Sequence, residues 1–312
     1  MVRLYNLDGM NKDGIKEEKN VGPVMVCFAG IFWGVISIFI NGLAKFGYDS
    51  FDIMCFRAWV GALLMLIFFL VKDRNLLKIN PRDIWMFIGT GIFSLTFFSY
   101  CYFTSIVRSG AAVAVVLLYT SPIFVMLMSA VIFKEKITSK KIVALILTFI
   151  GSALVAGLIG TGTKLSMESL LLGLGAGFGY ALYSIFAGFA VKKYSSLTVT
   201  FYTFLFSGLT LPVFRNPKTL IKTVSIEVVP WILGIALICT VLPYLCYTWG
   251  LGKMEAGKAA VLVTVEPLVG ALIGIFLYHE DANLFKMLGI ILIVLAVILL
   301  SISPPDVRMK KA

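Results

Sequence analysis

The sequence predicts an all-α polytopic membrane protein with ten transmembrane helices arranged as two inverted five-helix repeats. Three observations lead to this fold class. Apolar residues make up 60% of the chain and charged residues only 14%, and the mean hydropathy is +0.98, which leaves too little polar surface for a soluble protein. Apolar runs of spanning length recur along the chain, and its two halves resemble each other.

The predicted spans follow from the apolar runs, each long enough to cross a hydrocarbon core of about 30 Å. The charge-free runs are residues 24–44, 84–107, 109–133, 142–163, 169–191, 195–214 and 228–252. Three more runs, 51–71, 256–278 and 284–303, contain one or two ionisable residues each. The first run is too long for the core of a signal peptide, which has about 7 to 15 residues, so we expect it to be a retained span.

The basic residues indicate the orientation of these spans. The net charge of +11 does not predict a nucleic-acid partner, because the basic residues form short clusters between apolar runs and no basic face. Of the 27 basic residues, 19 lie in the two termini and the alternate loops on their side, seven lie in the opposite loops, and Arg57 lies within a span. Cytoplasmic loops hold the excess of lysine and arginine, so both termini are expected to be cytoplasmic and the protein to lie in the cell membrane.

Cysteine and histidine usage argues against most enzyme classes. The five cysteines all lie in apolar runs without C-x-x-C spacing, and His279 is the only histidine. No disulfide framework, metal site or cofactor is therefore predicted, and neither is a catalytic histidine dyad.

An internal repeat divides the chain. A shift of 145 residues aligns residues 101–102 with 246–247, Pro122 with Pro267 and Glu135 with Glu280, and a shift of 147 aligns 33–34 with 180–181. The predicted units are residues 24–158 and 168–302, with cytoplasmic tails at 1–23 and 303–312. Five spans is an odd number, so the two units should cross the membrane in opposite directions, as in many secondary transporters.

The same residues resemble the EamA-type ten-helix members of the drug/metabolite transporter superfamily. The motifs that carry the resemblance are Phe32-Trp33-Gly34, Phe56-Arg57-Ala58, Tyr119-Thr120-Ser121-Pro122, Phe133-Lys134-Glu135-Lys136, Thr264-Val265-Glu266-Pro267 and Tyr278-His279-Glu280-Asp281. The resemblance covers nearly all of residues 24–302 and implies export or exchange of small metabolites through a central cavity. It also implies a small residue such as glycine before Glu280, where this chain has His279.

Glu266 is the first candidate for substrate binding or ion coupling, because it lies near the middle of its span, where an ionisable group is costly. It could carry a coupling proton or bind a cationic group of the solute, but it could also bind carbonyls freed by Pro267. Pro122 and Pro267 predict helix breaks at matching places in the two halves, which is where transporters bind their solutes, and Pro243 predicts a further break. The other candidate site residues are Ser121, Tyr102, Tyr247, Trp33, Asn41, Tyr180, Tyr244 and Thr264.

Three charged residues are secondary candidates. Arg57 could bind an anionic group, although snorkelling to the interface or pairing with Asp52 is the simpler interpretation. Glu135 and Glu280 end matching helices at opposite faces, where each could pair with lysine or arginine and latch a gate, or be a solvated turn residue.

We therefore predict a secondary transporter, and no enzyme activity. It would move a small organic solute, an amino acid or a related polar molecule, by alternating access. Its expected partners are the solute, the lipid bilayer and protons as the candidate coupling ion, and its expected state is a monomer or weak homodimer. A channel would need charge rings or carbonyl loops along a pore, and an enzyme acting on lipid-linked substrates would need clustered acids or histidines at one face. Both alternatives stay open.

Overall fold

The structure is a computed structural model that describes residues 12–157, 166–214, 216, 220–221 and 224–301. These residues form helices, turns and loops, without a β-strand among them. Within this part of the chain, nine helical stretches are long and apolar enough to cross a membrane. They are Val21–Ala44, Ser50–Lys72, Pro81–Ser109, Ala111–Ile132, Met167–Ala190, Ser196–Val213, Val229–Leu251, Ala256–Tyr278 and Leu284–Ser301.

Several of these stretches consist of more than one helix. The first half contains α1 (Lys12–Gly34), α2 (Ile36–Ala44), α3 (Ser50–Lys72), the short 3₁₀ helices η2 (Arg74–Leu77) and η3 (Pro81–Asp83), α4 (Ile84–Ile88), the π-helix η4 (Gly89–Thr96), α5 (Phe97–Ser109), α6 (Ala111–Leu118), α7 (Ser121–Ile132) and α8 (Ser139–Val155). The second half contains α9 (Met167–Ala190), α10 (Ser196–Thr210), the 3₁₀ helix η5 (Leu211–Val213), α12 (Val229–Ala236), the π-helix η6 (Leu237–Val241), α13 (Leu242–Leu251), α14 (Ala256–Leu262), α15 (Val265–Tyr278) and α16 (Leu284–Ser301).

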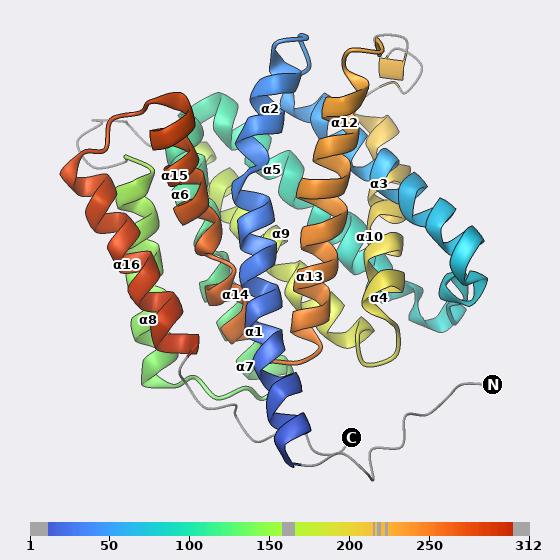
Figure 1. Ribbon diagram of the computed structural model, residues 1–312, viewed down its shortest axis with the longest axis horizontal. Coiled ribbons are helices and arrows are strands. Elements are labelled where there is room, and N and C mark those ends of the chain that lie inside the picture. Colours follow the sequence, from blue (N-terminus) through green and yellow to red (C-terminus); the bar gives the residue numbers. More distant parts are fainter. Residues whose placement is uncertain (1–11, 158–165, 215, 217–219, 222–223, 302–312) are drawn as a thin grey trace.

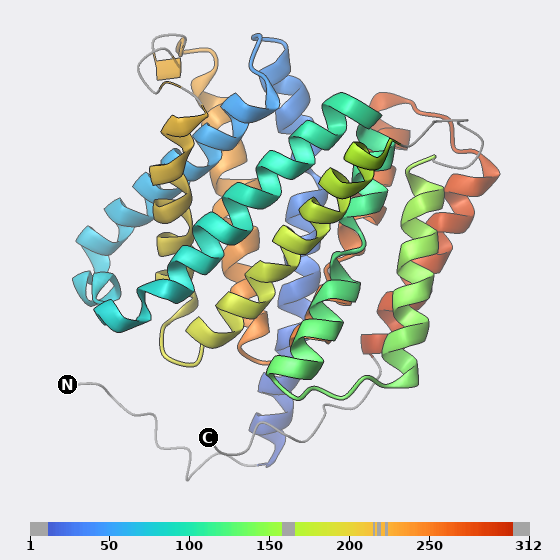
Figure 2. The same cartoon turned by 180° about the vertical axis from the view of Figure 1, so that it is seen from behind.

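The span predicted at residues 142–163 coincides with α8, which is 17 residues long. Residues 158–163 lie outside the described residues, so the count of ten stays a prediction. Figures 1 and 2 show α8 side by side with α16 at one edge of the bundle. An ideal β carbon on Gly289 of α16 would lie 2.6 Å from the carbonyl oxygen of Gly151 in α8, so the two glycines let the backbones approach closely.

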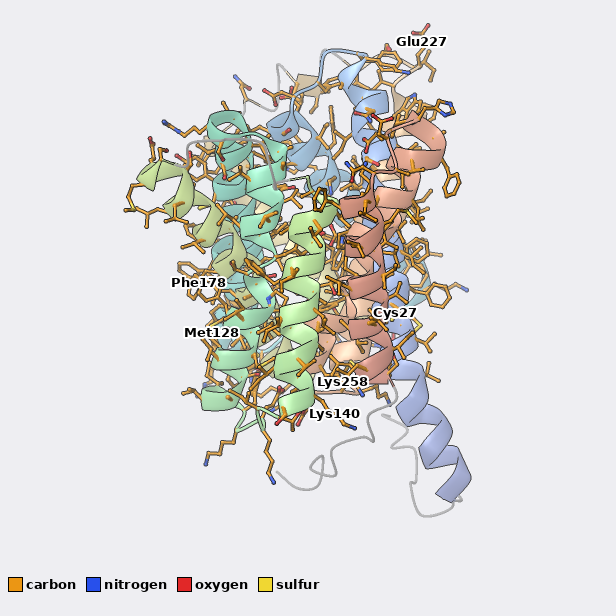
Figure 3. All side chains as sticks on the ribbon, turned by 90° about the vertical axis from the view of Figure 1, so that its left-hand side faces the viewer. Cys27, Met128, Lys140, Phe178, Glu227 and Lys258 are labelled. Atoms are coloured by element: carbon orange, nitrogen blue, oxygen red, sulfur yellow. The ribbon has the colours of Figure 1, made fainter. Side chains whose placement is uncertain are left out.

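The helices form one bundle in which α9 lies behind α1 in the view of Figure 1. The end of α7 and the start of α14 lie at the lower end of that view, whereas the start of α6 and the end of α15 lie at the upper end. Figure 3 shows the same two ends, with Lys140 and Lys258 near one and Glu227 at the other. Exposed apolar side chains such as Ile146, Leu171 and Ile291 cover the outside of the bundle, as expected for a surface that faces lipid.

The helices that carry Glu135 and Glu280 end in the same way. His279 follows α15 with φ 54° and ψ 35°, and Lys134 at the matching position of the first half has φ 56°. In both turns the next N–H group donates to a carbonyl six residues back, that of Ser129 at 3.3 Å and that of Gly274 at 3.0 Å. This left-handed turn is the position that favours glycine, and the chain fills it with a larger residue in both halves.

Asp83 joins the two halves of the bundle. It ends η3, and its carboxylate accepts bonds from Lys193 Nζ and from the Tyr194 hydroxyl, both at 2.7 Å. The Asp83 side chain is only 9% exposed, whereas that of Lys193 is 55% exposed. Burial, and then the nearby Asp83 carboxylate, raise the pKa of the Tyr194 phenol, so Tyr194 stays a hydrogen-bond donor at neutral pH.

Asp83→Ala is expected to destabilise the folded protein clearly, because it removes the acceptor of two part-buried hydrogen bonds that join the halves. Glu168→Ala is the matched control. It breaks the ion pair of Arg108 with Glu168 at 2.7 Å, whose side chains are 49% and 58% exposed, and exposed pairs contribute about 0–1 kcal/mol. The thermal midpoint of the detergent-solubilised protein should fall clearly for Asp83→Ala and little for Glu168→Ala. Equal shifts would contradict the buried connection.

Candidate functional site

Two helix breaks lie at matching positions in the two halves. The chain leaves α6 at Leu118 and enters α7 at Ser121, and it leaves α14 at Leu262 and enters α15 at Val265. Pro122 and Pro267 follow within the first turn of the second helix, where a missing N–H group removes no helical bond. The helices therefore break where the prolines predict, while the role of these breaks in transport stays a prediction.

A threonine hydroxyl bonds to the end of its own helix at each break. The Thr120 hydroxyl donates to the carbonyl oxygen of Leu117 at 2.6 Å, and the Thr264 hydroxyl donates to that of Val261 at 2.5 Å. Both threonines are buried. The Thr264 hydroxyl is thus occupied by its own helix, which gives Thr264 a structural task at the break.

A glycine of the opposing helix packs against each break. An ideal β carbon on Gly30 of α1 would lie 2.6 Å from the Val263 carbonyl oxygen and 3.2 Å from the Glu266 nitrogen. An ideal β carbon on Gly177 of α9 would lie 3.0 Å from the Leu117 carbonyl oxygen. Gly30 and Gly177 are themselves related by the shift of 147 residues. The repeat therefore preserves the contact between helix and break as well as the break.

An aromatic cluster fills the space between α1, α9 and α13. The Trp33 ring lies 6.1 Å from that of Tyr180, 5.2 Å from that of Tyr244 and 5.8 Å from that of Tyr247. Trp33 and Tyr180 are equivalent in the repeat, so the two halves meet here through matching residues. The cluster encloses a cavity lined by Trp33, Ser94, Phe98, Tyr180, Tyr183, Ser184, Tyr244 and Tyr247. Its volume is about 10 Å³, about the space of one water molecule, so a larger solute requires the helices to separate.

Three of the six hydroxyls that line this cavity bond to a neighbouring hydroxyl. The Tyr247 hydroxyl bonds with that of Ser184 at 2.7 Å, and the Tyr183 hydroxyl bonds with that of Thr248 at 2.6 Å. The Tyr180 hydroxyl is buried and has no hydrogen-bond partner among the described residues. A buried hydroxyl without a partner is costly, so Tyr180 offers the cavity an unused donor and acceptor.

The two tyrosines should therefore respond differently to loss of the hydroxyl. Tyr247→Phe is expected to destabilise the protein by about 1 kcal/mol, since it leaves Ser184 without its partner. Tyr180→Phe is expected to leave the stability unchanged or slightly higher. Thermal midpoints in detergent measure both changes, and a larger loss in Tyr180→Phe would contradict the observed pairing.

Glu266 begins α15 beside this cavity. No hydrogen bond or ion pair of its carboxylate occurs within the described part of the chain. Its charge acts on the nearby hydroxyls of Tyr102, Tyr119, Tyr180 and Tyr244, and Arg57 is the cation that acts on it. An ionisable group within a membrane span is costly and is by default a candidate for function.

Arg57 approaches the site from α3. Its Nε donates to the Thr240 hydroxyl at 2.8 Å and its Nη2 to the Cys239 carbonyl at 3.2 Å. Both acceptors belong to η6, where the wider π-helical turn leaves a carbonyl free for an external donor. Asp52, the partner considered for Arg57 from the sequence, lies in the capping box of α3, where its carboxylate accepts the Asp49 N–H at 3.1 Å.

The π-helices also match between the halves. The Thr96 hydroxyl donates to the carbonyl five residues back at 3.1 Å, and that of Thr240 does so at 2.9 Å. Thr96 also contacts Ser207 and Thr210 of α10, at 3.0 and 2.9 Å, as Thr240 contacts Arg57. Each π-helix is thus bonded to a helix of the opposite half.

The predicted site residues divide into two groups. Trp33, Tyr180, Tyr244 and Tyr247 line the cavity, and Tyr102 reaches it through Phe98, whose ring lies 5.6 Å away. Asn41 does not line the cavity and is exposed near the end of α2. Ser121 and Pro122 are buried at the first break, and Pro243 and Pro267 are buried near η6 and the second break, but none of these four lines the cavity.

Four lining residues were not predicted. Tyr183 and Ser184 lie three and four residues after Tyr180, and Phe98 lies four residues after Ser94, so helical periodicity places each set on one face. That spacing could have identified them. The rotation of each helix, which decides the face that turns inward, comes from packing between distant helices.

Known proteins resemble the chain over most of its length. The model of the EamA-like transporter family matches residues 20–157 and 167–302. An uncharacterized transporter of Archaeoglobus fulgidus is 27% identical over 274 residues, covering 86% of this chain and 92% of that protein. The uncharacterized inner membrane transporter YicL of Salmonella typhimurium is 27% identical, covering 90% of this chain and 95% of YicL. A crystal structure with 14% identity superposes with a TM-score of 0.72 and covers 89% of this chain and 95% of that one, which shows a shared fold.

Proposed function

This chain belongs to the EamA-like transporter family, and on that premise we propose that it moves a small organic solute with an amino group by alternating access. The family and the apolar helices make it an integral multi-pass membrane transporter, with a small-molecule substrate and the lipid bilayer as partners. Amino acids and related polar solutes are the class we expect, moved by export or exchange.

One observation carries this proposal. Matched helix breaks of the two halves flank an aromatic cavity, and Glu266, at the second break, has a carboxylate without a hydrogen-bond or ion-pair partner among the described residues. An aromatic cluster favours the apolar part of a solute and the face of a cation, and Glu266 supplies a negative charge for an amino group. Arg57 supplies a positive charge for a solute carboxylate. Two of its donors bond to η6, which holds the guanidinium group in place, and its charge also acts on Glu266.

The two halves provide the basis for alternating access. Each contributes a broken helix, a π-helix and a glycine that packs against a break. If one half rocks against the other, the same contacts can form at either end in turn. The small volume of the cavity supports an occluded carrier more than an open channel.

The test is transport by purified protein in liposomes. Uptake of amino acids, nucleosides and quaternary amines is measured with and without a pH gradient, together with counterflow after preloading. The proposal expects saturable uptake and counterflow for at least one amino compound. Unsaturable flux with single-channel currents would indicate a channel, and absence of counterflow across the whole panel would contradict the carrier.

A further inference from the structure

One end of the bundle is held closed by two contacts between the halves. Glu135, which follows α7, accepts bonds from the N–H groups of Ala256 at 2.7 Å and Gly257 at 3.1 Å. These groups begin α14 and have no acceptor within the helix. A carboxylate at this position is stabilised because its hydrogen bonds are charge-assisted and because the helix dipole favours a negative charge at the N-terminus.

The second contact is an ion pair. Lys141, whose side chain is 5% exposed, binds Glu255 at the start of α14, and its ammonium also donates to the Lys136 carbonyl at 2.8 Å. The two contacts join the turn between α7 and α8 to the turn between α13 and α14. Behind them α7 packs against α14, and an ideal β carbon on Gly257 would lie in ordinary contact with Met126 Cα, at 3.7 Å.

The repeat predicts the same contacts at the other end, and the structure does not form them. A shift of 145 residues aligns Glu135 with Glu280 and Lys141 with Lys286. It also aligns the start of α6 with the start of α14. Here Glu280 binds Lys286 Nζ at 2.9 Å and is 55% exposed. No carboxylate caps α6 among the described residues, and α15 packs against α1 and α16 without an extended contact to α6.

We propose that Glu135 and Glu280 are alternate latches, each closing one end of the transport path by capping the first turn of a helix from the opposite half. The observed conformation is closed by Glu135 at the α7–α14 end and unlatched at the α6–α15 end. In the alternate conformation Glu135 releases α14, and Glu280 leaves Lys286 to bind the N–H groups of Ala111 and Ala112. This inference rests on the proposed alternating access.

The two latches differ in strength. The counterpart of Glu255 under the same shift is Gly110, so the repeat places no second acid equivalent to Glu255 beside Lys286. Glu280 must also give up its bond to Lys286 before it can cap α6, whereas Glu135 has no such competing ion pair in the described chain. The protein without solute should therefore rest with the α7–α14 end closed.

Disulfide cross-linking of the full chain measures both ends without any solute. Met126→Cys with Gly257→Cys reports the closed α7–α14 end, and the matching pair, Ala271→Cys with Ala112→Cys, reports closure of the α6–α15 end. A disulfide requires Cα atoms about 4.4–6.8 Å apart. Each pair is oxidised in liposomes and the linked peptides are quantified by mass spectrometry. The native cysteines stay in place, and the chain without added cysteines gives the background.

The proposal expects rapid linkage of the 126–257 pair and slow linkage of the 112–271 pair. Glu135→Ala removes both charge-assisted hydrogen bonds, and loss of even one corresponds to about tenfold, so it should slow the first linkage and speed the second by at least about tenfold. Glu280→Ala should slow only the second. Glu255→Gln, which keeps the Glu135 cap, should shift both rates in the direction of Glu135→Ala but less. If Glu135→Ala does not fold, Glu255→Gln and Glu280→Ala decide the result.

Glu168→Ala is the matched control, since it breaks an exposed ion pair outside both latches. Unchanged linkage in the Glu135 and Glu280 variants, or equal changes in Glu168→Ala, would overturn the latch. Linkage is measured without transport, so the two proposals can fail separately. If the expected changes in linkage are absent while the protein shows saturable counterflow, only this inference is rejected. If the expected changes in linkage occur but counterflow is absent, the proposed function is rejected instead.

Discussion

Glu266→Gln is expected to lower solute flux in proteoliposomes by about a hundredfold, the loss that follows removal of about 3 kcal/mol of charge interaction from a buried site. The carboxylate has no partner in the described chain and lies among four tyrosines beside the cavity. Glutamine keeps the size of the side chain and one acceptor oxygen and replaces the other oxygen by an NH2 donor, so the change removes the charge at nearly constant shape.

The pH gradient separates the two roles of this carboxylate. If Glu266 carries a coupling proton, Glu266→Gln loses the dependence of uptake on the gradient but retains exchange between solute on both sides. If it binds the amino group, exchange is lost too, and Glu266→Asp raises KM more than it lowers the maximal rate. Ser121→Ala is the matched control, because Ser121 holds the equivalent position in the first half. Full transport by Glu266→Gln would contradict both roles.

The spans and their breaks could be predicted because they depend on local sequence. Long apolar runs specify helices of spanning length, and Pro122 and Pro267 cannot continue a helix that precedes them. The all-α multi-pass fold class is therefore confirmed, and so is the family, whose motifs occur in both halves. The count of ten spans and the orientation of the termini stay predictions. The repeat register also placed Trp33 and Tyr180 at equivalent positions, which meet in the structure.

The partners of charged residues could not be predicted in this way. Arg57 bonds to Thr240, 183 residues away, and this contact depends on a π-helical turn that no composition signal marks. Glu135 binds backbone N–H groups and no lysine or arginine in the described residues, so its contact is invisible to a search for opposite charges. Both contacts arise where helices of different halves meet, which depends on packing that local propensity does not determine.

The glycines at the two breaks are positions where the fold leaves little space. At Gly30 a β carbon would meet backbone atoms of the opposing helix, which cannot rotate away as a side chain could. At Gly270, in contrast, the nearest neighbour of an added β carbon would be the Gly34 carbonyl oxygen at 3.9 Å. The two positions belong to helices that pack together, α1 and α15, and differ mainly in this clearance.

Gly30→Ala is therefore expected to destabilise the protein by about 1–3 kcal/mol through overpacking, which corresponds to a thermal midpoint lower by about 5 °C. It should also reduce transport in the molecules that stay folded, because the added methyl group displaces the break that holds Glu266. Gly177→Ala should act in the same direction at the first break, where the Thr120 hydroxyl is the nearest atom. Gly270→Ala should change neither quantity, since alanine fits there and favours the helix. Thermal midpoints in detergent and initial uptake rates measure the series. Equal effects at Gly30 and Gly270 would show that helix propensity, and not the close approach to the break, determines the response.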